Sequence, residues 1–334
     1  MRITNKLLPV LFCFLAGCLL FAAPIELSGG NLKLVLYPET GSFSLFELSD
    51  IGKNRYEPLF EDRNFSTSSW FSVQMNGKIF KLTQKAGKQI VAEQTSLGAR
   101  FVFTLTDDFQ VEQEFSFTND SATGTPNAMR ISTRIENTSG KPASFALKAL
   151  LDTNLGEDEG VHFSTNDRKR ISAETRISPS RDPDSLILSR NKNSVFVFYL
   201  KGPQVSRPEA VFISNWDRLN TLTWLPEFIE GRSFNTVYSV NDSALLSLWP
   251  EKLLKANEKL EVVMTIGTSL SSPQDAQSVV SSTITRDPDS SKMLIQQLLD
   301  RIAVIEANPN TASDEELRKL NEALDIMLKE IEEK

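Results

Sequence analysis

The stretch "NMRISTRIENTSGKPASFALKALLDT", residues 127–153, decides the fold class of this chain. Apolar and polar residues alternate on both sides of the turn-forming "NTSGKP" at 137–142. Alternation with a period of two predicts β-strands with one dry face. We expect the two strands to pair as a hairpin, with Arg134 and Glu136 on the wet face. The expected core residues of this hairpin are Ile131, Ile135, Phe145, Leu147 and Leu151.

Short strands of the same kind extend in both directions, over residues 24–270, as in "NLKLVLYP" at 31–38, "ARFVFTLT" at 99–106 and "NTVYSV" at 235–240. No segment with the helical period of 3.6 interrupts them. Many strands without intervening helices predict a mainly β protein, built as a large antiparallel β-sandwich. One large sandwich and two fused ones both remain open, because the span exceeds the roughly 100 residues of an immunoglobulin-like module.

Beyond residue 270 the pattern changes, with a linker at 271–288 followed by an expected αα-hairpin at 289–334. Apolar residues there recur at steps of three and four, which predicts two helices with one apolar stripe each. Ser313 and Glu316 form a capping box for the second helix. The hairpin is expected to pack on the sandwich or on another protein, and the candidate partner-binding residues are Leu298, Ile302, Leu320, Leu324 and Met327.

The amino-terminal segment predicts export, with a signal peptide at 1–23 and a periplasmic or cell-envelope location. Two basic residues precede an apolar run at 7–23, which is short for a membrane-spanning helix. "LAGC" at 15–18 has the form of a lipoprotein box, and cleavage there would leave a lipid anchor on Cys18. Simple cleavage after Ala22 is the favoured alternative, because the apolar run continues past the cysteine.

Composition excludes several classes of chemistry. Cys13 and Cys18 are the only cysteines and both lie in the leader, so the mature body has no disulfide and no thiol nucleophile. The net charge of −7 disfavours a nucleic-acid partner. His162 is the single histidine, so zinc sites and serine triads are poorly supported. We expect His162 to be a structural residue whose ring is satisfied by its neighbours.

The acidic stretch "KALLDTNLGEDEG" at 148–160 allows three interpretations. Its oxygen-bearing side chains could bind calcium through Asp152, Asn154 and Asp158, although their spacing differs from the twelve-residue calcium loop. A pair of its carboxylates could act on a glycosidic bond. A solvated turn, with Asp152 bonding local backbone amides, is the favoured interpretation. No cofactor other than calcium is expected.

Two of the four tryptophans lie in one connection, "NWDRLNTLTW" at 215–224. Trp216, Asp217 and Trp224 are the candidate ligand-binding residues, because exposed indole rings stack on sugar rings and a carboxylate binds hydroxyl groups. Aromatic residues of β-sandwiches more often pack in the core, and that interpretation is favoured.

Three segments carry a resemblance to a known class: "RIENTSGKPASFALKALLDTNLGEDEG", "VFISNWDRL" and "DSALLSLWPEKLLKANEKLEVVMTIGTS". They resemble large secreted bacterial β-sandwich modules with an "LDTxLGxND", "NW" and "DSA" pattern, over roughly residues 30–270. The resemblance implies an extended sandwich, similar to the supersandwich of mutarotase-like domains, with no assigned activity. Here "GED" replaces "GND", and "KANEKL" replaces the usual glycine turn. Sugar epimerases of that fold use histidines with a carboxylate, and because only His162 exists, no catalytic residue is carried over.

Two functions are therefore expected. The first is a non-enzymatic exported protein, whose sandwich is a scaffold and whose helical hairpin binds an envelope protein or a second copy of the chain. The alternative is a carbohydrate-binding or carbohydrate-active module of mutarotase-like type, which uses Trp216, Trp224 and the acids near Asp152.

Overall fold

The computed structural model describes residues 23–268, except 51–52, 62–67, 84–86, 88, 120–125, 154, 158–159, 169, 238 and 240–241. Residues 1–22 of the predicted leader, with Cys18, lie outside the described residues, and so does the predicted helical hairpin with its partner-binding side chains. Within the described ranges no helix is long and apolar enough to cross a membrane. Export, lipidation and the domain boundaries therefore stay predictions.

A small antiparallel sheet is formed by the first four strands in chain order. Its strands are β1 (Ile25–Gly29), β2 (Leu32–Tyr37), β3 (Ser42–Asp50) and β4 (Arg55–Pro58). Buried side chains of β2 and β3 belong to the same apolar core as the two larger sheets.

The largest sheet has eight strands in the order β12-β14-β15-β19-β10-β9-β8-β7, all antiparallel. Their bounds are β7 (Gln89–Gln94), β8 (Gly98–Thr106), β9 (Phe109–Asn119), β10 (Pro126–Asn137), β12 (Ser164–Thr165), β14 (Leu186–Arg190), β15 (Val195–Tyr199) and β19 (Lys259–Gly267).

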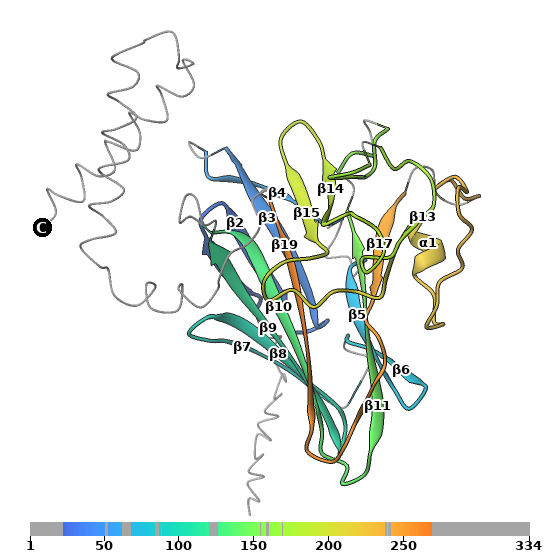
Figure 1. The fold of residues 1–334 in the computed structure, drawn as a ribbon. Coiled ribbons are helices and arrows are strands. Elements are labelled where there is room, and N and C mark those ends of the chain that lie inside the picture. The colour runs from blue at the N-terminus through green and yellow to red at the C-terminus, as the bar shows by residue number, and fades with distance from the viewer. Residues whose placement is uncertain are drawn as a thin grey trace, which may run out of the picture. The chain divides into compact units, whose positions relative to one another are not determined.

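The second large sheet has seven strands, in the order β13-β16-β17-β11-β5-β6 with β18 also paired to β11. Its strands are β5 (Trp70–Met75), β6 (Lys78–Lys81), β11 (Ala143–Asp152), β13 (Thr175–Ile177), β16 (Ala210–Ser214), β17 (Ala244–Leu248) and β18 (Lys252–Leu254). The helix of the described chain, α1 (Trp216–Leu219), follows β16. Figure 1 shows the two large sheets facing each other, with α1 beside β17.

One apolar core joins the three sheets, from Leu32 in β2 to Ile266 in β19. The expected mainly β, antiparallel sandwich is therefore confirmed, and it is one large sandwich rather than two fused ones. The five core residues predicted from the opening stretch are all buried: Ile131, Ile135, Phe145, Leu147 and Leu151. The side chains of Arg134 and Glu136 are each 42% exposed, as their wet-face assignment requires.

The predicted hairpin between the two strands of that stretch is wrong. β10 pairs with β9 and β19, whereas β11 pairs with β5, β17 and β18 in the other sheet. At the crossing, Asn137 is fully buried, and its Nδ2 donates to the carbonyl oxygens of Lys141 and Leu254 at 2.7 and 3.0 Å. Apolar and polar residues alternate in the same way in two paired strands of a hairpin and in two strands of facing sheets. The sequence pattern alone therefore does not distinguish a hairpin from a crossing between sheets.

The predicted strand at 235–240 is also wrong, because its described residues, 235–237 and 239, lie outside any strand. This segment is held by hydrogen bonds within itself and to earlier residues rather than by a sheet. Thr236 exchanges hydrogen bonds with Ser239, and Ser239 Oγ accepts from Asn215 Nδ2 at 3.0 Å.

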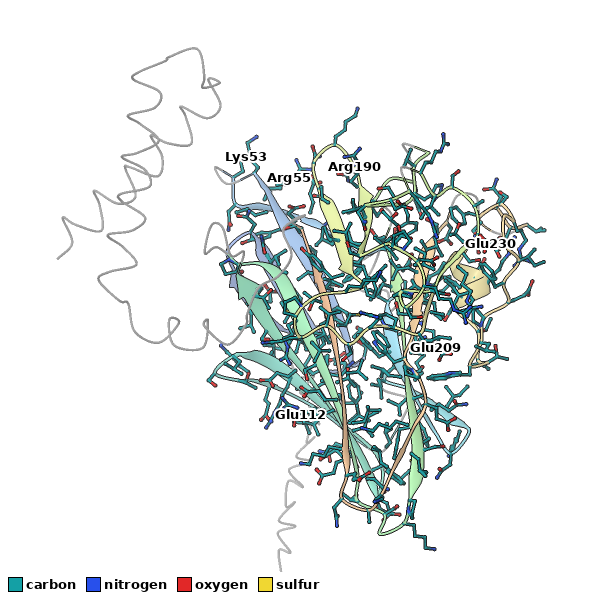
Figure 2. The ribbon with its side chains drawn as sticks, viewed as in Figure 1. Lys53, Arg55, Glu112, Arg190, Glu209 and Glu230 are labelled. Atoms are coloured by element: carbon teal, nitrogen blue, oxygen red, sulfur yellow. The ribbon has the colours of Figure 1, made fainter. Side chains whose placement is uncertain are left out.

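Charged side chains cover the outer face of the eight-stranded sheet around β8, β9 and β10, whereas a small apolar cluster that includes Val197 and Tyr199 lies at β15. Glu112, which Figure 2 labels, forms ion pairs with Arg100 and Arg134 at 3.4 and 3.2 Å. Such a face is solvated, as is usual for one side of an antiparallel sheet. The outer face of the seven-stranded sheet differs, because a second apolar cluster covers it.

Candidate functional site

The outer face of the seven-stranded sheet is lined by aromatic residues. β11 is buried along nearly its whole length, which means that both of its faces are covered. The segment 215–237, which follows β16, contributes three rings that are only partly buried. The cluster on this face consists of Trp70, Leu150, Ala210, Phe212, Leu219, Ala244, Leu246 and Leu248, packed against Trp216, Trp224 and Phe228.

Trp216 and Trp224, predicted as ligand-binding residues, therefore both lie on this outer face. Trp216 is the first residue of α1, and its Nε1 donates to the carbonyl oxygen of Ser68 at 3.0 Å. Asn215 caps the helix by accepting from the amide of Asp217 at 2.9 Å. The Asp217 side chain is exposed and accepts a hydrogen bond from Ser239 Oγ at 3.2 Å.

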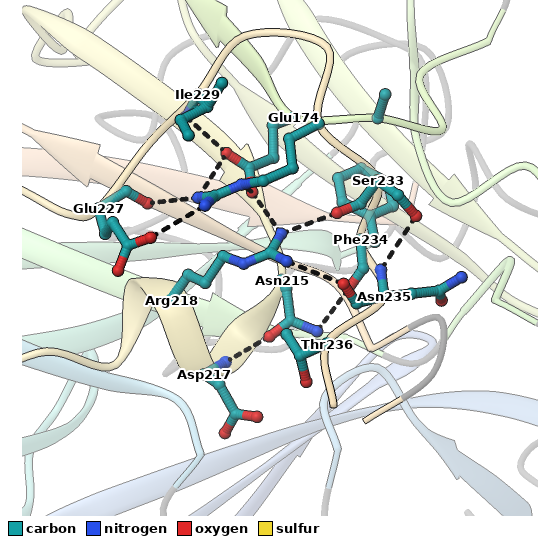
Figure 3. Close-up of polar contacts among 12 residues, drawn as sticks. Glu174, Asn215, Asp217, Arg218, Glu227, Ile229, Ser233, Phe234, Asn235 and Thr236 are labelled. Carbon is teal, nitrogen blue, oxygen red and sulfur yellow. Dashed lines mark hydrogen bonds and ion pairs between the residues drawn. The ribbon is translucent and has the colours of Figure 1, made fainter. Parts of the chain in front are cut away.

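A buried carboxylate holds segment 215–237 in place (Figure 3). Glu174 is fully buried, and its Oε1 accepts from Arg218 of α1 at 2.5 Å and from Arg232 at 2.7 Å. Its Oε2 accepts from the amide of Ile229 at 2.8 Å. Burial alone would raise the pKa of Glu174, but the hydrogen bonds from Arg232 and the Ile229 amide outweigh burial and lower it. Sequence reasoning missed this residue, because no local pattern marks a lone glutamate as buried.

Two lysines flank Trp70 on the same face. Lys81 Nζ lies 4.2 Å from the centre of the Trp70 ring, and Lys148 Nζ lies 5.4 Å from it and 5.4 Å from the Trp224 ring. Lys148 is only 1% exposed and donates to the carbonyl oxygen of Thr223 at 2.9 Å. Burial lowers the pKa of each lysine to about 8, and the charge of Lys81 lowers that of Lys148 further. Sequence reasoning missed both lysines as site residues. Lys148 lies inside an otherwise apolar strand, where no local pattern marks a single lysine as part of a site.

At the end of β11 the same face carries Asp152, four residues beyond Lys148 and hence on the same side of the strand. Asp152 is only 6% exposed, so the expected solvated turn is wrong for this residue. Burial raises the pKa of Asp152 to about 8, the hydrogen bond from Ser68 opposes the rise, and the charges of Asp242, Glu157 and Glu61 add to it.

The predicted calcium ligands are only partly described. Asp152 is described, whereas Asn154 and Asp158 lie outside the described residues. Among the residues with described positions, no group of three or more His, Cys, Asp or Glu side chains is arranged to hold a metal ion. Calcium binding by this stretch therefore stays a prediction.

His162 is linked to Glu157 through a serine. The ring of His162 is 4% exposed and packs on Phe234, and its Nδ1 lies 2.7 Å from Ser243 Oγ. Glu157 Oε1 accepts from the amide of Ser243 at 2.8 Å and from its hydroxyl at 3.4 Å. His162 is thus satisfied, as predicted. A hydroxyl both donates and accepts, so a proton can pass between His162 and Glu157 through Ser243.

Burial shifts the pKa values of Glu157 and His162 in the directions that favour their uncharged forms. It raises the pKa of Glu157 to about 7, which the Ser243 amide opposes and the charge of Asp242 reinforces. It lowers the pKa of His162, and the charge of Arg170 lowers it further. A carboxyl group that titrates near pH 7 is suited to general acid–base chemistry.

A scan against models of known protein families found no match, and a search of curated proteins found none either. Solved structures do resemble the chain. A galactose mutarotase related enzyme from Lactobacillus acidophilus has a TM-score of 0.41 and 10% identity, over 75% of this chain and 98% of that one. A galactose mutarotase-like protein from Lactobacillus casei has a TM-score of 0.45 and 8% identity, over 74% and 100%. Another from Clostridium acetobutylicum has a TM-score of 0.41 and 10% identity, over 74% and 95%.

These neighbours agree with the mutarotase-like architecture expected from the sequence, and the likeness is one of fold. They also correct the first functional expectation. A non-enzymatic scaffold for protein partners is contradicted, because the structures that match are described as galactose mutarotase-like proteins. The alternative, a carbohydrate-binding or carbohydrate-active module, stays a proposal.

Proposed function

We propose that the protein binds carbohydrate on the outer face of its seven-stranded sheet. The observation that supports this proposal is the arrangement of Trp216 and Trp224, partly exposed, over a sheet face that also carries Lys148 and Asp152. A sugar ring has apolar faces of C–H groups and a rim of hydroxyl groups. Aromatic rings beside a few fixed polar groups match both parts, as in most small-molecule sites.

The segment that carries these tryptophans is held by Glu174 on one side and by the sheet on the other. Such preorganisation lowers the entropic cost of binding, because the rings are already fixed before the sugar arrives. Asp152 and Lys148 lie about 13 Å apart on one strand face, judged from the rise per residue. That separation suits a ligand of more than one sugar unit.

Replacing Trp224 with alanine is expected to weaken glycan binding at least about tenfold, because the ring supplies apolar contact area to the sugar. A glycan array identifies the ligand, and calorimetric titration with that glycan measures the change. The matched control is Leu222→Ala, since Leu222 is 93% exposed on the same segment. Absence of any glycan above background, or equal affinities for wild type and Trp224→Ala, would contradict the proposal.

We propose proton transfer to the bound sugar as a second function, on the evidence of the His162–Ser243–Glu157 chain of hydrogen bonds. Interconversion of the α and β anomers of an aldose requires that a proton is taken up from the anomeric hydroxyl and that a proton is supplied to the ring oxygen. Glu157 is only partly buried, so among these three hydrogen-bonded residues it is the one that faces a ligand. Glu157 takes the proton of the anomeric hydroxyl, and a proton returns to the ring oxygen as the bond between C1 and the ring oxygen breaks. His162 is the buried end of the relay that holds the proton in between.

For this second function, Glu157→Gln is expected to slow the mutarotation of galactose at least about tenfold, because an amide takes up no proton at neutral pH. Polarimetry or NMR exchange between the anomers measures the rate. Glu251→Gln, a change at an exposed residue between β17 and β18, serves as the control and should leave the rate unchanged. A wild-type rate no faster than in buffer would remove this second function while leaving binding intact.

A further inference from the structure

Lys148, Ser72 and Lys81 lie in register across three neighbouring strands of the seven-stranded sheet. Lys148 of β11 is opposite Ser72 of β5, and Ser72 is opposite Lys81 of β6. Residues directly opposite each other in antiparallel strands point to the same side, so the three side chains form a row on the outer face. β6 is the edge strand, and Lys81 at its end of the row is only partly buried.

The two amines of this row have no counter-charge in the part of the chain that the structure describes. Lys148 Nζ donates to the Thr223 carbonyl oxygen, and its other neighbours are aromatic rings. The charge that acts on it most is the like charge of Lys81. Two like charges that share a buried site are unfavourable unless an anion is present between them.

Two further donors on the same face have no partner. Ser72 is 1% exposed and Trp70 is 4% exposed, and neither Ser72 Oγ nor Trp70 Nε1 has a hydrogen-bond partner in the described structure. Trp70 precedes Ser72 by two residues in β5, so both side chains belong to the face that carries the amines. Buried polar groups normally find partners, and these two therefore point to a ligand.

We propose that Lys81, Ser72 and Lys148 form an oxyanion subsite, and that the carbohydrate bound on this face is acidic. The inference rests on the proposed carbohydrate binding and specifies its substrate class. The ammonium groups, the hydroxyl and the indole N–H are all donors, and a carboxylate, sulfate or phosphate on a sugar offers only acceptors with negative charge. The anion enters beside Lys81, at the edge of the sheet.

The electrostatics of the two lysines support this assignment. Burial lowers the pKa of both lysines to about 8, which shows that the site holds their charges with difficulty when no anion is present. A bound oxyanion supplies negative charge between the two ammonium groups, which stabilises their charged forms and raises the pKa values of both lysines. No such gain is available to a neutral sugar hydroxyl.

The test uses four sugars that differ only at carbon 6: galactose, galacturonate, galactose 6-sulfate and galactose 6-phosphate. Calorimetric titration of the wild-type protein is expected to show at least one acidic sugar binding about tenfold or more tightly than galactose. The carboxylate, sulfate or phosphate that gives the largest gain identifies the source of the oxyanion. Equal affinities for all four sugars would overturn the inference and leave carbohydrate binding in place.

The variants are Lys81→Met, Lys148→Met and the double variant, with Lys78→Met as the matched control. Lys78 is exposed and lies on the opposite side of β6 from Lys81. The two single changes and the double change are expected to remove the preference for the acidic sugar. For Lys81→Met, galactose binding is expected to change by less than about twofold. The Lys78→Met variant keeps the preference. A preference that survives in the double variant, with thermal melts showing an intact fold, would overturn the assignment to these lysines.

A third measurement separates failure of this subsite from failure of the proposed function. If no sugar binds, titration with inorganic sulfate at constant ionic strength decides, because sulfate is itself an oxyanion. A rise in the midpoint of thermal unfolding with sulfate that is larger in wild type than in the double variant supports the anion subsite even if no carbohydrate binds. Equal shifts show only the general stabilising effect of sulfate, and they would overturn the subsite as well.

Discussion

Replacing Glu174 with alanine is expected to lower the free energy of unfolding by about 3–5 kcal/mol. The carboxylate is fully buried and accepts hydrogen bonds from Arg218, Arg232 and the Ile229 amide. Its removal takes from Arg218, 16% exposed, the counter-charge it has in the described structure, and leaves Arg232, 22% exposed, with only the exposed Glu227. Urea unfolding followed by tryptophan fluorescence measures the loss.

The same change is expected to loosen segment 215–237 before the sandwich unfolds, because Glu174 joins α1 to the residues that follow it (Figure 3). Hydrogen exchange of this segment and glycan affinity should therefore change together. The matched control is Glu227→Ala, since Glu227 is 70% exposed and pairs with the same Arg232 at 2.9 Å. Its loss is expected to cost no more than about 1 kcal/mol. Equal effects of the two changes would contradict the anchoring role of Glu174.

The pH dependence of Glu174 follows from the direction of its pKa shift. Because the pKa is lowered in the folded protein, the stabilisation is fully present above pH 4.5 and is lost as the pH falls through the folded value. Acid unfolding of the wild type should therefore be steeper than that of Glu174→Ala.

Replacing Asp152 with asparagine is expected to stabilise the protein at neutral pH by several kcal/mol. Burial raises the pKa of this carboxyl from its ordinary 3.8 to about 8, so ionisation at pH 7 favours the unfolded chain. At pH 7 the ceiling is roughly 4 kcal/mol, because only the interval between the ordinary pKa of 3.8 and pH 7 contributes. Asparagine keeps the size and polar character of the protonated acid and carries no proton that titrates.

The sign of the pH effect is opposite to that of Glu174. With a raised folded pKa, the contribution of Asp152 is fully present below pH 3.8 and is lost as the pH rises through about 8. Thermal melts between pH 4 and pH 8 should therefore show a gap between Asp152→Asn and wild type that widens with pH. The control is Asp108→Asn, an exposed turn residue between β8 and β9. A gap that does not change with pH would show that Asp152 is not held in its neutral form.

Local alternation was enough to predict much of the fold. Ile131, Ile135 and Phe145 were placed in the core because a strand with one dry face repeats every two residues, and that repeat depends only on neighbouring positions. The absence of helical periodicity up to residue 270 predicted the antiparallel sandwich for the same reason. His162 was predicted to be satisfied, and it is, through Ser243 and Phe234.

The candidate site was predicted only in part. Trp216 and Trp224 were named because tryptophan is a recognisable residue for sugars, and they do share one face. Lys148 and Glu174 were not named, since a single charged residue in an apolar strand or loop has no local signature of its partners. Their roles depend on Thr223 and Arg232, which lie 75 and 58 residues away in the chain.

The sequence by itself determined which residues of the opening stretch face inward, that the body is mainly β, and that residues 24–270 contain no cysteine. Only the tertiary structure decided that β10 and β11 lie in different sheets, and that Lys81, Ser72 and Lys148 form one row. The physical reason is that burial of one strand face is a local requirement with a fixed period. The choice of a neighbouring strand is a non-local one, made by packing the whole core, and many partners satisfy the same alternation.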